Sequence, residues 1–402
     1  MIRRSARALT ALALLPWACI APACGGGGAS HTCTPAAHYP AGILHGPLVS
    51  RPTPTSVTIA FWTVAAVVGG VEYGTTPLFG SVVSDVAPGT RHVLVLDALT
   101  GSTPYSYRLL VDGAPVGVPH AFTTPPGQDA TPVRFVVTGD GGTGCATEFD
   151  TIALATAQAP DFVLHTGDAA YEDGTTSDVR NGFTIPFADL AATTAIFTTI
   201  GNHDSHTQGG KPLLDAQALP ESAPGESRWY SFAWGPCHVV CLDTETSTTA
   251  GSAQRTWLEA DLASDSALWT FVFFHHPPYS SSRHGSNATL EADLVPLFDA
   301  RHVDVVFTGH DHDYERTFPL AAGLPVDVGM EPDYVDPTGT VYVVTGGGGK
   351  GLYPAGTSAF TAFSVSSFHV TRVAVEAETL TLEAVGQDGT VLDHATITKT
   401  PP

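Results

Sequence analysis

The chain has few basic residues. Its 402 residues include 17 lysines and arginines against 39 aspartates and glutamates, which gives a formal net charge of −22 at pH 7. Such a surface repels the phosphate backbone of nucleic acids, which argues against DNA or RNA as a partner. Charged residues make up only 14% of the chain and glycine occurs 41 times, a composition that suits an exported protein rich in β-strands.

A long apolar run is missing as well. The apolar stretch over residues 8–20 is shorter than the about 20 residues of a membrane-spanning helix, and Pro16 interrupts it. Two arginines precede this stretch and Ala-Pro-Ala follows it at residues 21–23, which predicts a secretory signal peptide over residues 1–23. We therefore expect an exported protein.

Removal of the signal peptide would leave Cys24 at the N-terminus, at the start of a glycine-rich tether over residues 24–38. This arrangement resembles a bacterial lipoprotein, in which the cysteine carries a lipid that anchors the chain to the membrane. The expected location is then the outer membrane, the periplasm or the cell surface. Ala21 stands where leucine is usual, so secretion without an anchor stays open as the alternative.

Cysteines are scarce, with six in the whole chain. Those outside the signal peptide and the lipidation site are Cys33, Cys145, Cys237 and Cys241. Export permits disulfides, but four cysteines allow three pairings and the sequence selects none of them. Cys237 and Cys241 are four residues apart in an expected strand, which is too far for them to bridge each other.

Short alternating strands separated by turns characterise residues 39–126. Val57, Ile59 and Phe61, for example, give one apolar face to an expected strand over residues 56–63. Further strands are expected at 71–73, 92–96 and 105–111. Turn signals about every ten residues indicate an antiparallel β-sandwich. The region resembles a fibronectin type III-like domain, which we expect to act as a spacer and packing partner.

The pattern changes after a linker at residues 124–127, where strands begin to alternate with helices. Helices are expected at 148–158, with Thr147 as the N-cap, and at 254–263 and 290–300. Strand and helix in alternation predict a parallel component in the sheet. Alternating strands return at the C-terminal end of the chain, over 340–345, 368–376, 380–385 and 391–398, with a hairpin signal at 387–389.

Five apolar strands each end in side chains with oxygen or nitrogen donors. The run at residues 303–307 leads into Gly309-His310-Asp311-His312, and the other four lead to Asp140, Asp168, Asn202 and His275. Open α/β sheets hold their ligands at the carboxyl ends of the strands, so we expect these side chains at one edge. One such histidine is usually structural, but five donor-bearing ends in one chain indicate a metal site. Because no cysteine is among them, the donors suit iron, manganese or zinc.

The same five segments resemble, in order, the motif blocks of the purple acid phosphatase branch of the metallophosphoesterases. They are Asp140-Gly141-Gly142, Gly167-Asp168-Ala169-Ala170-Tyr171, Gly201-Asn202-His203-Asp204, Val272-Phe273-Phe274-His275 and Gly309-His310-Asp311-His312. The tyrosine in the second block is the feature of the purple branch. The resemblance implies a β-sandwich N-terminal domain over 39–126. Over 132–400 it implies a calcineurin-like metallophosphoesterase catalytic domain, an α/β (α+β) sandwich of two mixed sheets flanked by helices.

The resemblance also implies two metal ions. The implied ligands are Asp140, Tyr171 and His312 for the first ion, Asn202, His275 and His310 for the second, and Asp168 as the bridge. A phenolate with carboxylates favours iron(III) at the first position, and zinc, manganese or iron(II) is expected at the second. Two ions about 3.5 to 4 Å apart can stabilise both the attacking and the leaving oxygen of an in-line displacement at phosphorus.

The implied activity is hydrolysis of small phosphate monoesters by a metal-bound hydroxide, as in acid phosphatases. The implied catalytic residues are His203, which would lie near the leaving group, Asp204, which would orient it, and His284, which would contact the phosphate. Either histidine would protonate the leaving oxygen, which is worth about 10² to 10⁴ in rate. The alternative, that both only hydrogen-bond the ligands, stays open. His276 stands where relatives often carry serine and is expected beside the ligands.

Some neighbouring motifs fit other roles. Gly346–Gly349 with Lys350 suggests a phosphate loop, but Gly351 replaces the required Ser or Thr, so the run is expected to let a loop pass close to the metals. Arg316 is expected to pair with Glu315 or a core acid, and Tyr314 to pack. Arg283 is left open between a substrate contact and a structural role.

Two other functions stay open. A phosphodiesterase or nucleotidase of the same fold would use the same metals and differ in the walls of its pocket. A non-catalytic surface-binding lipoprotein would use the sandwich domain, but the seven filled ligand positions argue against it. The expected partners are a small phosphate ester and, through a lipid on Cys24, a membrane. The sequence predicts no oligomeric state.

Overall fold

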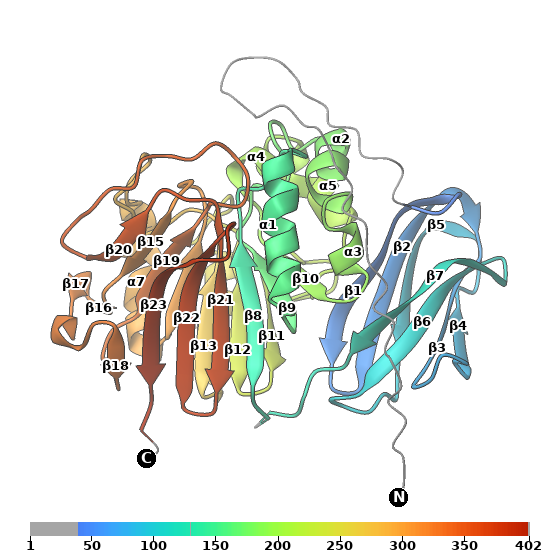
Figure 1. Ribbon diagram of the computed structural model, residues 1–402, viewed down its shortest axis with the longest axis horizontal. Coiled ribbons are helices and arrows are strands. Elements are labelled where there is room, and N and C mark those ends of the chain that lie inside the picture. Colours follow the sequence, from blue (N-terminus) through green and yellow to red (C-terminus); the bar gives the residue numbers. More distant parts are fainter. Residues whose placement is uncertain (1–38, 129, 401–402) are drawn as a thin grey trace, which may run out of the picture.

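The computed structural model describes residues 39–128 and 130–400, which Figure 1 shows in colour. The predicted signal peptide and the tether with Cys24 and Cys33 lie outside the described residues. None of the helices in the described part has the length and apolar character needed to cross a bilayer.

The N-terminal strands form two antiparallel sheets. One has the order β1 (Ile43–Thr53), β2 (Ser56–Val67) and β5 (Gly89–Leu96), and the other β4 (Ser81–Ser84), β3 (Gly69–Gly74), β6 (Pro104–Val111) and β7 (Ala114–Thr123). Val57, Ile59 and Phe61 from β2 are fully buried with Val71 and Tyr107 from the other sheet. The predicted antiparallel sandwich is therefore confirmed.

This sandwich packs against the rest of the chain through backbone acceptors and apolar side chains. Tyr107 donates a hydrogen bond from its hydroxyl to the carbonyl oxygen of Ala192, at 2.6 Å. Arg51 donates from Nε to the carbonyl oxygen of Leu219, also at 2.6 Å, and Trp62 belongs to an apolar cluster with Ala218. Strand β1 lies beside β10 of the larger part (Figure 1).

Two mixed seven-stranded sheets form the larger part. The first has the order β10 (Ala195–Thr198), β9 (Phe162–His165), β8 (Val133–Thr138), β21 (His369–Glu376), β22 (Thr379–Gly386), β23 (Val391–Thr398) and β18 (Asp333–Val335). The second has the order β11 (Tyr230–Trp234), β12 (Cys237–Cys241), β13 (Trp269–Phe273), β14 (Val305–Thr308), β19 (Val341–Thr345), β15 (Tyr314–Thr317) and β20 (Thr361–Val365). A small hairpin pairs β16 (Leu320–Ala321) with β17 (Leu324–Pro325). The expectation of two mixed sheets is confirmed.

The two sheets pack face to face. The ring of Phe135 on β8 lies 5.2 Å from that of Phe271 on β13 and 6.1 Å from that of Phe307 on β14, so aromatic side chains fill the space between the sheets. The opposite faces carry a second set of apolar residues, among them Val136 on β8 and Val306 on β14. Burial on both faces explains why these strands are continuous apolar runs rather than alternating ones.

Helices cover the outer faces of the sheets. Helix α1 (Ala146–Ala157) packs on the first sheet (Figure 1), and α6 (Ala253–Ser264) and α7 (Ala288–Arg301) share an apolar cluster with the second. The short helices are α2 (Thr176–Val179), α3 (Ala188–Ala191), α4 (Asn202–Ser205) and α5 (Lys211–Asp215). A π-helical turn spans Arg180–Thr184, and 3-10 turns span Gln208–Gly210 and Val328–Met330.

The N-cap predicted for the first helix is wrong. Helix α1 begins two residues earlier than expected, with Cys145 as its N-cap, so Thr147 lies inside the first turn. Glu148 takes over the local hydrogen bonding, because its carboxylate accepts from the backbone N–H groups of Thr143 and Gly144, at 3.1 and 2.6 Å.

Arg316 is fully buried at the end of the second sheet and is paired with acids. Its guanidinium donates to Asp393 at 2.6 and 3.0 Å and to Glu331 at 2.7 Å, and these acids raise its pKa against the effect of burial. Tyr314 packs in the same place and donates to Asp393 at 2.8 Å. The expectations of a core acid for Arg316 and of a packing role for Tyr314 are confirmed.

We predict that Arg316→Met lowers the free energy of unfolding by about 3 to 5 kcal/mol, because Asp393 stays buried without its partner. Urea denaturation followed by circular dichroism measures this. The matched control is Arg134→Met, which removes an exposed pair with Glu376 at 3.1 Å and should change stability by at most about 1 kcal/mol. Equal losses in the two variants would contradict the prediction.

Candidate metal centre

The predicted donor residues come from strands of both large sheets. In the first sheet, β8, β9 and β10 are parallel neighbours and are followed by Asp140, Asp168 and Asn202. In the second sheet, the parallel strands β13 and β14 are followed by His275 and His310. The site therefore forms where the carboxyl ends of two sheets meet, and not along the edge of one sheet as the sequence suggested. The reason is that β13 and β14 pair only with strands of their own sheet.

Tight turns follow three of these strands. Asp140, Asp168 and His310 have φ values of +58°, +52° and +69°, a backbone conformation that is uncommon for residues with a side chain and is found mostly where the surrounding structure enforces it. Gly309 permits a close approach, since a Cβ there would lie 2.3 Å from Oδ2 of Asp140. The turns bring all three side chains back over the strand ends.

The residues predicted for the first ion lie together. The hydroxyl of Tyr171 is 3.4 Å from Oδ1 of Asp140 and 3.2 Å from Nε2 of His312. Nδ1 of His312 donates to the carbonyl oxygen of Gly351, at 2.8 Å. This bond fixes the tautomer and leaves the lone pair of Nε2 directed at Tyr171 and Asp140, as in a metal-binding histidine.

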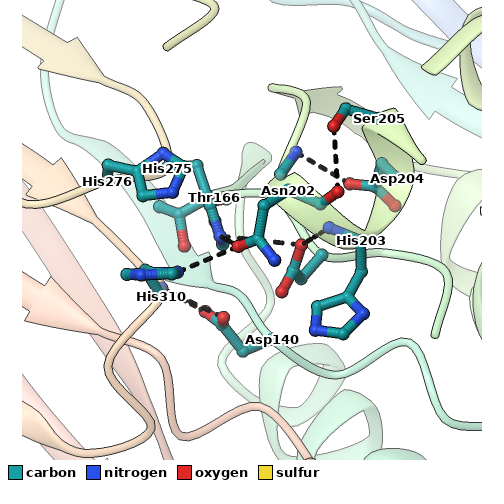
Figure 2. Close-up of polar contacts among 12 residues, drawn as sticks. Asp140, Thr166, Asn202, His203, Asp204, Ser205, His275, His276 and His310 are labelled. Atoms are coloured by element: carbon teal, nitrogen blue, oxygen red, sulfur yellow. Dashed lines mark hydrogen bonds and ion pairs between the residues drawn. The ribbon is translucent and has the colours of Figure 1, made fainter. Parts of the chain in front are cut away.

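The residues predicted for the second ion form an adjacent group (Figure 2). Oδ1 of Asn202 lies 3.0 Å from Nε2 of His275 and 2.9 Å from Nδ1 of His310. Nδ1 of His275 donates to the carbonyl oxygen of Thr166 at 2.8 Å, so Nε2 keeps its lone pair. Oδ1 of Asp168 is 3.6 Å from the same Nε2. Asp168 thus adjoins the second group.

The charges of the centre fit a pair of cations. Asp140 and Asp168 are buried, and burial raises the pKa of each; the charge of Asp168 raises that of Asp140 further. No lysine or arginine of the described residues pairs with either carboxylate. Oxygens of both acids and a ring nitrogen of His275 lie within 4.8 Å of one another. Buried carboxylates without a cationic partner, set among histidine lone pairs, are suited to metal ions.

Comparison with known proteins agrees with this geometry. Residues 133–314 match the model of the family described as calcineurin-like phosphoesterase. This part of the chain is therefore a calcineurin-like phosphoesterase domain. It is related to the purple acid phosphatases, so the predicted resemblance is confirmed, and its fold implies a dinuclear metal centre.

The chain has relatives in plants and bacteria. Purple acid phosphatase 18 of Arabidopsis thaliana is 29% identical over 70% of this chain and 65% of its own length. An uncharacterised protein of Mycobacterium tuberculosis is 30% identical over 63% of this chain and 57% of its own length. These matches span about three fifths of the relatives' length. The structure of purple acid phosphatase PPD1 from yellow lupin seeds has the same fold, with a TM-score of 0.78 at 23% identity over 88% of this chain and 74% of that one.

His203 lies beside the candidate metal centre. Its backbone N–H donates to Oδ1 of Asp168 at 2.9 Å, and its ring packs 4.5 Å from that of Tyr171. Nδ1 donates to the carbonyl oxygen of Glu172 at 2.6 Å, which leaves Nε2 without a partner among the described residues. The expectation that Asp204 orients His203 is corrected. Asp204 instead accepts from the backbone N–H groups of Gly201 and Ala169, at 2.9 and 3.2 Å, and so joins the two metal-binding loops.

His284 reaches the centre from a different loop. Its ring lies 4.2 Å from the ring of His310 and its backbone N–H donates to Asp311 at 2.9 Å. The guanidinium of the neighbouring Arg283 lies 4.7 Å above the ring of Tyr353, which in turn stacks on His312 at 4.1 Å. Arg283 thus belongs to the wall of the site rather than to the core.

The glycine run passes close to the predicted metal ligand Asp140, in agreement with the expectation. A Cβ on Gly346 would lie 3.0 Å from Oδ2 of Asp140, and the backbone N–H of Lys350 donates to the carbonyl oxygen of Asp140 at 2.9 Å. The ammonium group of Lys350 lies 4.3 Å above the ring of Tyr171 and pairs with Glu172.

Sequence reasoning missed several residues around the site. His276 was expected beside the ligands, but the residues that it contacts were not predicted. Its ring is 4.3 Å from the ring of His310, and its Nδ1 is 3.2 Å from Oε1 of Glu245. A ring nitrogen of His276 lies within 4.8 Å of nitrogens of His275 and His310. The consecutive histidines were the only signal for this contact, and nothing in the sequence pointed to Glu245 or Tyr353.

We predict that Asp168→Ala removes both metals, because its carboxylate adjoins both groups, whereas His310→Ala spares the first. Elemental analysis of the purified variants measures the metal content per chain. The control is Asp261→Ala, which removes a partly exposed acid paired with His238 outside the centre and should keep both metals. Equal metal loss in the Asp168 and His310 variants would contradict the partition into two groups.

Proposed function

We propose that this metallophosphoesterase hydrolyses phosphate monoesters and is an acid phosphatase with two metal ions. The observation that carries the proposal is the convergence of the seven predicted ligands into two adjoining groups, with Asp168 beside both. Two bound ions would activate a water for in-line attack and neutralise charge on the phosphate. Residues of the protein itself would perform the remaining parts of the reaction.

The first task of these side chains is to hold the ligands in place. The rings of His275 and His312 each donate a hydrogen bond from Nδ1 to a backbone carbonyl oxygen, so neither ring can turn away from the centre. The backbone N–H of His203 fixes the carboxylate of Asp168 in the same way. Such outer hydrogen bonds orient ligands before the substrate arrives and so lower the reorganisation that the reaction needs.

The second task is to deliver a proton to the leaving oxygen. His203 and His284 both border the centre without being among the predicted ligands. Nδ1 of His203 is held by Glu172, so Nε2 is the atom that would carry the proton. His284 stands beside His310 on another loop, so the two histidines approach from different elements.

The donor sets suggest which ions are bound. Burial and the nearby Asp168 and Asp140 raise the pKa of Tyr171, so its phenolate forms only against a strongly charged cation. We therefore propose iron(III) in the group with Asp140, Tyr171 and His312. The second group has two imidazoles and a neutral amide, which suit a divalent ion: zinc, manganese or iron(II).

We further propose export, from the signal peptide predicted over residues 1–23, with a lipid on Cys24 as the membrane anchor. A small phosphate ester would then be taken from outside the cytoplasm. Hydroxide at iron(III) forms in more acidic solution than at a divalent ion, which would suit such surroundings.

We predict that the purified protein contains iron and is coloured by charge transfer from Tyr171 to iron. Tyr171→Phe removes the phenolate, so the visible band should vanish while the far-ultraviolet circular dichroism stays unchanged. The control is Tyr353→Phe, which alters a ring beside His312 that is outside the predicted ligand set and should keep the band. A colourless protein holding two zinc or two manganese ions would reject the iron assignment.

We predict that His203→Ala and His284→Ala slow hydrolysis of alkyl phosphates by about 10² to 10⁴, because poor leaving groups need the proton. p-Nitrophenyl phosphate, whose leaving group departs unaided, should be slowed far less. Turnover measured against leaving-group pKa, with metal content determined in parallel, tests this.

The control for this series is His394→Ala, an exposed histidine on β23 that should change neither slope nor metal content. Parallel slopes for wild type and variants would reject the proton-donor role. A wild type that hydrolyses bis(p-nitrophenyl) phosphate faster than the monoester would reject the assignment as a monoesterase in favour of a diesterase.

A further inference from the structure

The segment after β14 carries two kinds of side chain on alternate residues. His310 and His312 are directed into the metal centre, whereas Asp311 and Glu315 have their hydrogen bonds on another side. The backbone bends through residues 310–313 before β15 begins at Tyr314, so the side chains of neighbouring residues leave it in different directions. Asp311 and Glu315 are almost completely buried, and buried carboxylates require hydrogen-bond donors.

One loop supplies four of these donors, and Thr361 on β20 donates a further hydrogen bond to Oε1 of Glu315, at 2.5 Å. We call residues 280–284 the serine loop. Ser280 donates from its hydroxyl to Oδ2 of Asp311 at 2.5 Å, and the backbone N–H of His284 donates to Oδ1 of the same acid at 2.9 Å. Ser281 donates to Glu315 with both its backbone N–H, at 2.6 Å, and its hydroxyl, at 2.7 Å. Each carboxylate thus holds the loop through both of its oxygens.

The serine loop carries two of the groups that border the centre. The ring of His284 lies 4.2 Å from that of His310, and Arg283 lies above Tyr353. Both groups lie at the end of the loop, within four residues of the first hydrogen bond to Asp311. Their position relative to the metals is therefore set by the four hydrogen bonds, and a displacement of about 1 Å at a reacting group can cost 10²-fold in rate.

We propose that Asp311 and Glu315 are positioning residues that fasten the serine loop and thereby place His284 at the leaving oxygen. The proposal rests on the proposed function, in which His284 delivers the proton. It assigns to one segment both the binding of metal, through His310 and His312, and the placement of the proton donor. Neither acid touches the substrate.

The test removes the two serine hydroxyls and leaves the acids beside the metal ligands intact. Ser280→Ala with Ser281→Ala should lower kcat/KM for glycerol 2-phosphate about tenfold through kcat, with metal content unchanged. In a chain that already carries His284→Ala, the same two substitutions should lower kcat/KM less than twofold. The reason is that the effects of substitutions at groups that act through one another are not additive. The control is Ser231→Ala, which removes a matched hydroxyl bond of 2.7 Å to Asp261 outside the site and should leave activity unchanged.

A second measurement separates this proposal from the proposed function. Amide hydrogen exchange at His284 should become at least tenfold faster in the double serine variant and stay unchanged in Ser231→Ala, whether or not the protein hydrolyses any ester. Unchanged exchange would overturn the fastening of the loop. An equal loss of activity with and without His284, or a His284→Ala variant with full activity, would overturn the placement role. A wild type inactive on phosphate monoesters would reject the proposed function alone.

Discussion

Two buried carboxylates that pair with no lysine or arginine in the described part of the chain are the constraint on which the structure depends. Asp140 and Asp168 stand at the ends of neighbouring strands, in a backbone conformation that the following residues must enforce. The cost of burying such charges is large unless cations neutralise them. The aromatic packing between the two sheets supplies the rigidity that holds this arrangement, since Phe135, Phe271 and Phe307 interlock directly behind the strand ends.

Much of the centre was predictable because each ligand follows an apolar run and a turn that the local sequence specifies. Only the position of a strand end was needed to predict Asp140, Asn202 and His275 as candidate ligands. The other candidate ligands were predicted from the order of the motifs. The assignment of the strands to two sheets was not predictable, because β13 and β8 are equally apolar and strand pairing is decided by contacts distant in the chain. The two mixed sheets were predicted from the resemblance to a family and not from the periodicity of the apolar residues.

Two of the errors were local, and each of these had a competing hydrogen bond as its cause. Thr147 lost the N-cap because Glu148 satisfies the preceding backbone donors from inside the helix. Asp204 has the right residue type to orient a histidine, but its Oδ2 accepts from two backbone N–H groups and the ring of His203 is held by the carbonyl oxygen of Glu172 instead. Glu245 and Tyr353 belong to no pattern near their own positions, and only the fold brings them to the histidines.

The contact between the sandwich and the larger part has a consequence for solubility. Strand β10 is the last strand of the first large sheet, and its outer edge would otherwise offer unpaired backbone groups to another chain. Strand β1 lies beside it, and Tyr107 and Arg51 occupy nearby carbonyl oxygens. The N-terminal sandwich therefore shields the edge of the sheet that carries Asn202 and protects the larger part of the chain against association edge to edge.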